Sequence, residues 1–371
     1  MYKKICTLFL IILCISCTQT KESGIETLTV HLTENNPSIY DLFSKVELIP
    51  LATNDSCLIE DIERITLTED NMYIFDGRRK SLYVFDPDGH FIRRIARKGN
   101  GPGEYQMLSD VFIDKDIALL DPMGFIRNYD IHGKFLNIQE LPVKPNYQSI
   151  VLLGEDKWAL WSCLDKEDEC ISVLNKSDSS PISSYWKDDR MLNMGILKPF
   201  YVYNGKTYFS TAYRNQVYEL TPDSLKTVYQ WDFGKDNIKE SLLSEYMEIE
   251  NPSKRNEQIL SDLESGILSY SMDTPNQTNH FYYTCLQRGV GIDAPKTHVF
   301  YKKADGTSYV FKRFREGISL NPLYFCDNYT IAKIPSSEYN QYKMVLSNSD
   351  FATLQSREED ENPCLVRLHF K

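Results

Sequence analysis

The sequence lacks the short motifs that mark several common kinds of active site. No Gly-x-Ser-x-Gly elbow is present, no Gly-Lys-Ser/Thr follows the glycine-rich stretch 99–103, and no C-x-x-C pair occurs after Cys17. These absences argue against a serine-hydrolase elbow, a P-loop and a structural zinc site. The six histidines are scattered, and none is at metal-ligand spacing. We therefore predict no catalytic residue, no cofactor and no metal ligand, with a structural or axial Ca2+ as the open alternative.

Long apolar runs and excess positive charge are also missing from most of the chain. After residue 17 no segment is apolar enough to cross a bilayer as a helix. The formal net charge is -11, which argues against nucleic acid as a partner because phosphates must be neutralised by Lys and Arg. Aromatic residues make up 12% of the chain, with 24 Tyr and 18 Phe. This composition favours β-strands with a large buried core.

The N-terminus has the pattern of an export signal. Lys3 and Lys4 precede an apolar run over 5–15, which is too short to span a bilayer, and Ser16-Cys17 follows before the chain turns polar. The pattern resembles a bacterial lipoprotein signal, in which Cys17 would carry the lipid and Thr18 would favour the outer membrane. The resemblance departs from the usual motif because Cys14 stands where Leu is common. An ordinary secretory peptide cleaved nearby is the alternative.

Six cysteines follow Cys17, and an even number in an exported chain permits disulfides. Cys163 and Cys170 stand symmetrically about Lys166-Glu167, so a tight hairpin there would place them opposite each other. A disulfide between them is one hypothesis. Two separate buried thiols are the alternative, since free cysteine is commonly buried.

A repeat of 44 residues organises the first part of the chain. The segments VFDPDGHFI and NYDIHGKFL place Asp86 and Asp130, Gly89 and Gly133, and Phe91 and Phe135 at this spacing. The strands predicted in these two units cover 62–67, 72–75, 82–85 and 91–95, then 111–113, 118–120, 126–129 and 135–138. Four short strands per period of 40 to 45 residues are typical of a β-propeller blade. Helical solenoids would show a 3.6-residue periodicity, which is absent.

Four weaker units follow, so the pattern predicts an all-β, six-bladed β-propeller over 18–371. Its ring would close by pairing the last unit with a strand at 27–32 or at 46–51. The stretch 237–266 departs from the β pattern with helical spacing of apolar residues, Asn251-Pro252 as a helix start and Gly266 as an end. We predict two short helices inserted between blades four and five.

The segment SLYVFDPDGHFIRRIARKGNGPGEY resembles the repeat of NHL-type and TolB-like six-bladed propellers. With the leader and the ending ENPCLVRLHFK, the chain is similar to six-bladed β-propeller lipoproteins of Bacteroidetes. The run Gly-Pro-Gly-Glu-Tyr is the most specific part of this likeness, while blades three to six match loosely. The resemblance implies the fold and a place in the cell envelope, and it implies no reaction.

Candidate ligand-binding residues come from a basic cluster in the first unit. Arg78, Arg79, Arg97 and Tyr105 are named as candidates for an anionic sugar, a phosphate group or an acidic partner. Charged residues at turns and strand edges also protect exposed strands, and this is the favoured interpretation. The glycine-rich stretch 99–103 leads into another strand and not into a helix, so it is interpreted as a crossing between blades.

These observations together predict a non-catalytic binding or scaffold protein of the cell envelope. It would be a monomer, anchored in the membrane through Cys17 on the periplasmic or surface side. Its partner would be a glycan, a peptide or an envelope protein. The alternative is an enzyme, a lyase or a metal-assisted hydrolase, with its site in the axial channel.

Overall fold

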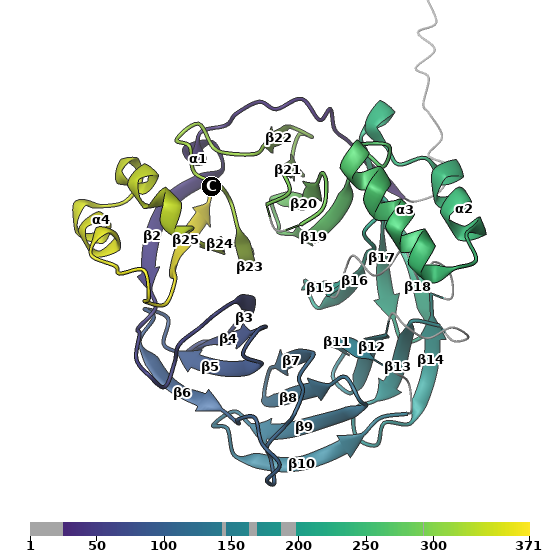
Figure 1. Cartoon of the computed structure of the whole chain (residues 1–371), viewed down its shortest axis with the longest axis vertical. Coiled ribbons are helices and arrows are strands. Elements are labelled where there is room, and N and C mark those ends of the chain that lie inside the picture. Colours follow the sequence, from purple (N-terminus) through teal and green to yellow (C-terminus); the bar gives the residue numbers. More distant parts are fainter. Residues whose placement is uncertain (1–24, 143–145, 163–168, 187–197, 292) are drawn as a thin grey trace, which may run out of the picture.

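The computed structural model describes residues 25–142, 146–162, 169–186, 198–291 and 293–371. Six sheets stand around a common axis and form a six-bladed β-propeller (Figure 1). Five sheets have four strands, and the fourth blade has five. The predicted fold class is confirmed.

The strands of each blade run from the centre of the ring outward. In blades one to three they are β3 (Ile62–Leu67), β4 (Met72–Asp76), β5 (Ser81–Phe85) and β6 (Phe91–Ile95); β7 (Asp110–Ile113), β8 (Asp116–Asp121), β9 (Phe125–Asp130) and β10 (Phe135–Glu140); and β11 (Tyr147–Leu153), β12 (Lys157–Ser162), β13 (Ile171–Asn175) and β14 (Pro181–Tyr185). In blades four and five they are β15 (Phe200–Tyr203), β16 (Lys206–Phe209), β17 (Gln216–Thr221), β18 (Ser224–Asp232) and β1 (Glu26–Thr29), then β19 (Ser271–Gln277), β20 (Phe281–Gln287), β21 (Lys296–Lys302) and β22 (Ser308–Phe311). Blade six contains β23 (Pro322–Phe325), β24 (Tyr329–Lys333), β25 (Cys364–Phe370) and β2 (Phe43–Pro50).

The repeated aspartates shape the hairpins that gave the 44-residue signal. Asp86 accepts hydrogen bonds from the backbone N–H groups of Asp88 and His90, at 3.0 and 2.8 Å. Asp130 repeats this arrangement one blade later, with the N–H groups of His132 and Lys134. The glycine of each hairpin has a positive φ that disfavours any side chain. The repeat is therefore a repeat of turn geometry.

The N-terminal segment passes along the outside of three blades. β1 pairs in parallel with β18, and the amide group of Asn35 then bonds to the backbone of β22 in blade five. β2 completes blade six by pairing antiparallel with β25. Of the two partners predicted for the last blade, the later segment therefore closes the ring, and the earlier one is an extra strand of blade four.

Two helices extend from the connection between blades four and five, as predicted. They are α2 (Glu240–Glu248) and α3 (Pro252–Ser265). The side chain of Asn251 caps α3 by accepting from Lys254 N–H, and Gly266 ends it in the left-handed conformation. A second insertion, between β24 and β25, was not predicted and contains the 3₁₀ helix η3 (Ser336–Met344) and the helix α4 (Asn348–Gln355). The remaining helices are α1 (Ile39–Leu42) and η2 (Gly234–Asp236).

The hydrophobic core is divided among the seams of the ring. Six clusters of buried side chains each join two neighbouring blades, and a seventh holds α2 and α3 against the turn that contains Ala212 and Tyr213. Each seam depends on both of its blades, so the ring must close for any blade to be fully packed.

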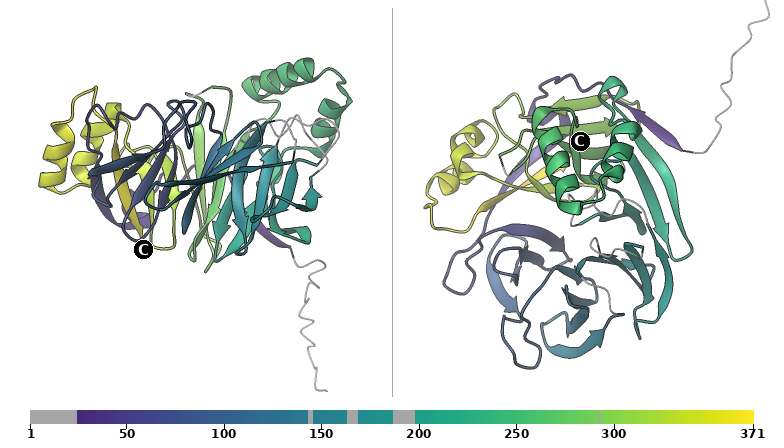
Figure 2. Two further views of the ribbon diagram at one scale, coloured as in Figure 1. Left: turned by 90° about the horizontal axis from the view of Figure 1, so that it is seen from below. Right: turned by 45° about the vertical axis from the view of Figure 1, so that its right-hand side comes forward.

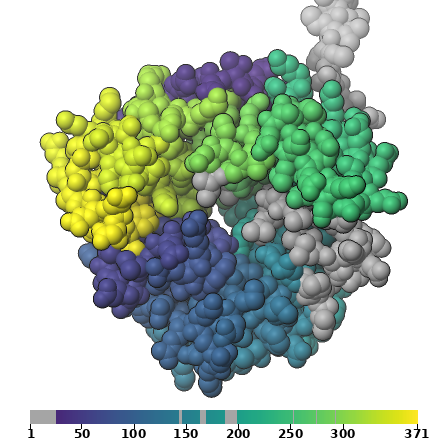
Figure 3. Space-filling view, in the orientation of Figure 1, coloured from purple at the N-terminus to yellow at the C-terminus, as the bar shows by residue number. Residues whose placement is uncertain are grey.

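The two ends of the propeller differ in their connections. One end, here called the helix-bearing face, has the links from each second strand to the third and from each blade to the next, including α2 and α3. The other end, the hairpin face, has the short hairpins that join the first strand to the second and the third to the fourth. Figure 2 shows α2 and α3 standing on one side of the ring and the C-terminus on the other. The helix-bearing face has a narrow hollow at its centre (Figure 3).

Candidate functional site

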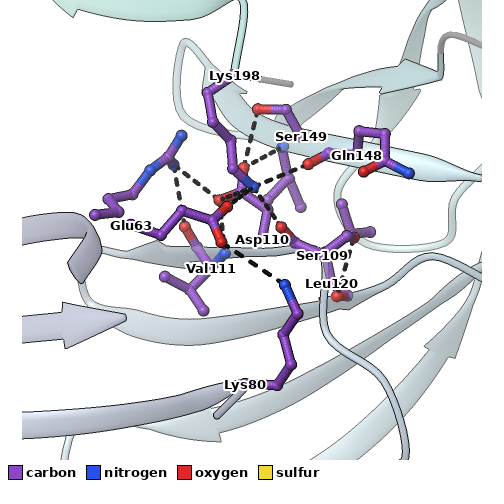
Figure 4. Close-up of polar contacts among 11 residues, drawn as sticks. Glu63, Lys80, Ser109, Asp110, Val111, Leu120, Gln148, Ser149 and Lys198 are labelled. Carbon is purple, nitrogen blue, oxygen red and sulfur yellow. Dashed lines mark hydrogen bonds and ion pairs between the residues drawn. The ribbon is translucent and has the colours of Figure 1, made fainter. Parts of the chain in front are cut away.

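Charged side chains from the first three blades gather near the centre of the helix-bearing face (Figure 4). They come from the starts of the inner strands β3 and β7, from the turn after β4, and from the residue that follows 187–197. We call them the axial charge cluster: Glu63, Arg64, Lys80, Asp110 and Lys198.

Asp110 is the buried centre of this cluster, with no exposed surface. Its carboxylate accepts hydrogen bonds from Ser149 Oγ and the Ile150 N–H, both at 2.9 Å, which joins blade two to blade three. Arg64 Nη1 and Lys198 Nζ lie 3.3 and 3.2 Å from Oδ1. Burial alone would raise the pKa of this carboxyl, but the two cations and the backbone donors hold it below its usual value. Asp110 is therefore ionised and fully engaged.

Lys198 is the most highly connected cation of the cluster. Its ammonium group donates to the backbone carbonyls of Ser109 and of Gln148, the latter at 3.0 Å. It also lies 3.1 Å from Glu63 Oε1. One side chain from the entry to blade four thus contacts blades one, two and three.

Glu63 connects the buried part of the cluster to its more exposed part. Its second carboxylate oxygen lies 3.7 Å from Lys80 Nζ, and the Lys80 side chain is 39% exposed. A Cβ on Gly77 would lie 2.3 Å from the same oxygen, so only glycine leaves room for Glu63. The cluster contains three cations and two anions, so its net positive charge is nearest to solvent at Lys80.

This geometry favours cohesion and recognition over proton transfer. Every charged group of the cluster has an opposite charge within 4 Å, and the buried carboxylate accepts from several donors. General acid–base catalysis needs a group that can change its protonation state near neutral pH. Among the residues that the structure describes, no group of three or more His, Cys, Asp and Glu is arranged to hold a metal ion.

The candidate ligand residues from the sequence lie outside this cluster and apart from one another. Arg79 pairs with Glu60 at 3.0 Å, and Arg97 pairs with Glu104 at 2.7 Å. Tyr105 is fully buried, and its hydroxyl donates to the carbonyl of Lys80. Arg78 is fixed through its backbone, whose N–H donates to Asp76.

The glycine-rich stretch 99–103 binds a carboxylate of its own chain. Glu104 Oε2 accepts from the Gly101 N–H at 2.8 Å, and a Cβ on Gly99 would lie only 2.1 Å from that oxygen. The hydrogen bond from Gly101, followed by the bond from Arg97, lowers the pKa of Glu104. This loop thus surrounds an internal anion and leads toward strand β7, in agreement with a crossing between blades.

A second unusual group lies on the hairpin face, at the seam between blades four and five. The ammonium group of Lys303 lies 4.4 Å from the ring centres of both Tyr203 and Tyr282 and 3.0 Å from Gln277 Oε1. Burial lowers the pKa of Lys303 to about 8, against the opposing effect of Glu26 and Asp327. Sequence reasoning missed this site because its members come from five strands or turns with no common spacing.

Two predictions fall on residues that the structure does not describe. Cys17 lies before residue 25, and Cys163 lies in the undescribed range 163–168. Cys170 is buried directly before β13. The lipid anchor and the disulfide both remain predictions. Within the described ranges, none of the helices combines the length and the apolar character required to traverse a bilayer.

The fold and the axial charge cluster define this chain as a six-bladed β-propeller with a polar centre. More particularly, the chain belongs to the DUF4934 family, a domain of unknown function, whose profile matches residues 27–369. No curated protein matches the sequence.

Solved structures support the same architecture. The chain is similar to a protein of Bacteroides fragilis NCTC 9343 that is inferred to be exported, with 20% identity and a TM-score of 0.75 over 93% of this chain and 99% of the other. Lower similarity is found to the RRP9 WD40 repeats (9% identity, TM-score 0.47, 91% and 100% coverage) and to the Pan2 WD40 domain of Neurospora crassa (10%, 0.44, 82% and 81%). At these identities the likeness concerns the fold alone.

Proposed function

We infer that this protein is exported, is anchored to the membrane through a lipid on Cys17, and acts as a non-catalytic binding or scaffold protein of the cell envelope. The leader pattern and the inferred export of the Bacteroides fragilis relative support the location. The recognition surface is the helix-bearing face.

One asymmetry carries this proposal. Exposed large apolar side chains occur in five connections of the helix-bearing face: Met107, Met123, Ile267, Val290 and Met344. Among the described residues, none of the exposed large apolar side chains lies in a short hairpin of the opposite face. Apolar groups gathered on one face of a soluble domain are typical of an interaction surface, and methionine adapts well to different partners.

Site-specific photo-crosslinking in the native envelope tests the surface. A photoreactive residue replaces Met123 or Ile267 in one set of cells, and Asp88 of a hairpin-face turn in the matched control. We expect a discrete adduct from the first two positions and none from Asp88. Equal crosslinking from both faces, or no adduct from either, would contradict the proposed surface.

Processing of the leader tests the anchor separately. We expect globomycin to block maturation of the wild-type protein and Cys17→Ala to release it from the membrane fraction. A Cys17→Ala protein that still fractionates with the membrane would rule out the lipid anchor and leave the crosslinking result unaffected.

A further inference from the structure

The outer edge of blade two is protected less than the outer edges of the other blades. An unpaired strand edge offers its backbone groups to other chains, and proteins usually block it with Lys, Arg, Pro or a covering segment. β10 is the outermost strand of its sheet and contains no Lys, Arg or Pro. Its one charged residue is Glu140, at its end.

The remaining outer edges all have such protection. The edge of β18 is covered by β1, β22 is bonded to Asn35, and β2 carries Lys45 and packs against α4. β6 carries Arg93 and Arg94, and β14 begins at Pro181. β10 is thus the exception among the six blades.

The 44-residue repeat identifies the side chain responsible. The second residue of β6 and of β10 sits at a register shift, and both of these residues, Ile92 and Leu136, are exposed. Two positions later blade one has Arg94, whereas blade two has Ile138, which is 51% exposed. A charge that would repel a strand is therefore replaced by an apolar side chain at the equivalent position.

A groove of about 620 Å³ runs beside this edge toward blade three. Leu136 and Ile138 form its apolar part. Three carboxylates, those of Asp116, Glu155 and Asp156, line it together with one amine, that of Lys176, which already pairs with Asp116 at 3.7 Å. The groove therefore favours a ligand that is apolar in part and positively charged.

The molecule itself shows that a blade can accept an additional strand. β1 pairs in parallel with the outer strand of blade four, and it buries Leu28 completely. A strand added to β10 would gain backbone hydrogen bonds in the same way and would place alternate side chains against Leu136 and Ile138.

We propose that β10 is a docking edge for an extended peptide with alternating apolar residues and flanking basic residues. A second copy of this chain is a poorer occupant, because the whole protein carries a net charge of -11 and the groove is itself acidic. This edge is separate from the helix-bearing face, so the test below does not depend on the proposed function.

The test uses a fluorescein-labelled peptide, Lys-Thr-Val-Thr-Val-Thr-Lys, and its binding to the mature protein by fluorescence anisotropy. Ile138→Arg recreates the arrangement of blade one, and Ile92→Arg is the matched control at an exposed apolar residue of another edge. We expect binding to weaken at least about ten-fold in Ile138→Arg and to stay unchanged in Ile92→Arg. We also expect the peptide to slow amide hydrogen exchange in 135–140.

Two further peptides separate the parts of the proposal. Glutamate in place of both lysines should weaken binding because the groove is acidic, and proline in place of both valines should abolish it because proline cannot pair as a strand. Equal binding of all three peptides, or no binding of the first, would overturn the proposal. Dimerisation of the wild-type protein in sedimentation, lost in Ile138→Arg, would overturn it in favour of a second copy.

Discussion

The ammonium nitrogen of Lys198 lies 3.2 Å from Oδ1 of Asp110, so a residue at the entry to blade four neutralises the buried carboxylate at the start of blade two. This ion pair and its neighbours fasten the inner strands at the centre of the ring. It gives the first prediction.

Asp110→Asn should lower the free energy of unfolding by about 3 kcal/mol, because it leaves Arg64 and Lys198 beside a neutral group. Chemical denaturation at pH 7 measures the loss. Glu219→Gln is the control, since Glu219 pairs with an exposed Lys206 at 2.9 Å and should cost less than about 1 kcal/mol. Adding Lys198→Met to Asp110→Asn should recover part of the loss, and strict additivity of the two changes would count against a direct pairing.

The contribution of Asp110 should depend on pH in a defined direction. Its pKa is lower in the folded protein than in the unfolded chain, so the unfolded state takes up a proton first as the pH falls. The stability difference between wild type and Asp110→Asn should therefore be full at pH 7 and shrink below about pH 4. A difference that stays constant down to pH 3 would show that Asp110 does not titrate in this range.

His298 should remain neutral well into the acid range. Burial lowers the pKa of His298 to about 3, and its Nδ1 lies 2.9 Å from the Tyr283 hydroxyl. The unfolded chain binds this proton near pH 6.5, so His298 should reduce stability as the pH falls from about 6.5 toward 3. NMR titration of the imidazole checks the pKa, with exposed His90 as the control. Titration of His298 near pH 6 would contradict its burial.

Lys303 should be the amine that becomes neutral most readily. With a pKa of about 8, it should react faster with acetic anhydride at pH 8 than Lys206, whose pKa Glu219 raises. The folded protein gives up this proton before the unfolded chain does, so stability should rise between pH 8 and about pH 10 and should not do so in Lys303→Met. Competitive labelling with mass spectrometry gives the rates, and equal rates for both lysines would refute the prediction.

Gly89 should tolerate alanine less well than Gly205. Both have positive φ, at 93° and 69°, but a Cβ on Gly89 would also lie 2.4 Å from the Pro50 carbonyl oxygen. Nothing lies within 4 Å of a Cβ on Gly205. We expect Gly205→Ala to cost about 1 kcal/mol for backbone strain alone and Gly89→Ala clearly more. Thermal unfolding of the two variants compares them directly, and similar midpoints would mean that the backbone near Pro50 yields.

The sequence predicts the blades best where turn chemistry repeats. Asp86 and Asp130 mark equivalent hairpins, and the predicted strands of the first two blades agree with the structure to within two residues at each end. The inserted helices are predicted equally well, because Asn251 and Gly266 are clear end signals. Blade five is a partial failure: its first strand, Ser271–Gln277, lies outside the predicted unit, and Pro275 interrupts its strand pattern.

The insertion in blade six and the charged sites leave no local signal. The segment 336–355 combines a 3₁₀ turn with a short helix rich in Ser and Asn, which are poor helix formers in a helix interior. Asp110 and Lys198 are far apart in the chain and meet only because the ring brings their blades together. The alternation at 27–32 predicts a strand correctly, but alternation does not specify a partner, and so the pairing of β1 with β18 became visible only in three dimensions.

The path of β1 has a consequence for how the molecule would stand on a membrane. β1 runs parallel to β18, an outer strand that ends toward the helix-bearing face, so β1 starts on the hairpin side. From Cys17 the tether to β1 has eight residues and spans at most roughly 27 Å. A lipid on Cys17 would therefore hold the polar hairpins and Lys303 near the headgroups, while the helices and the exposed methionines would point away from the bilayer, toward whatever diffuses past.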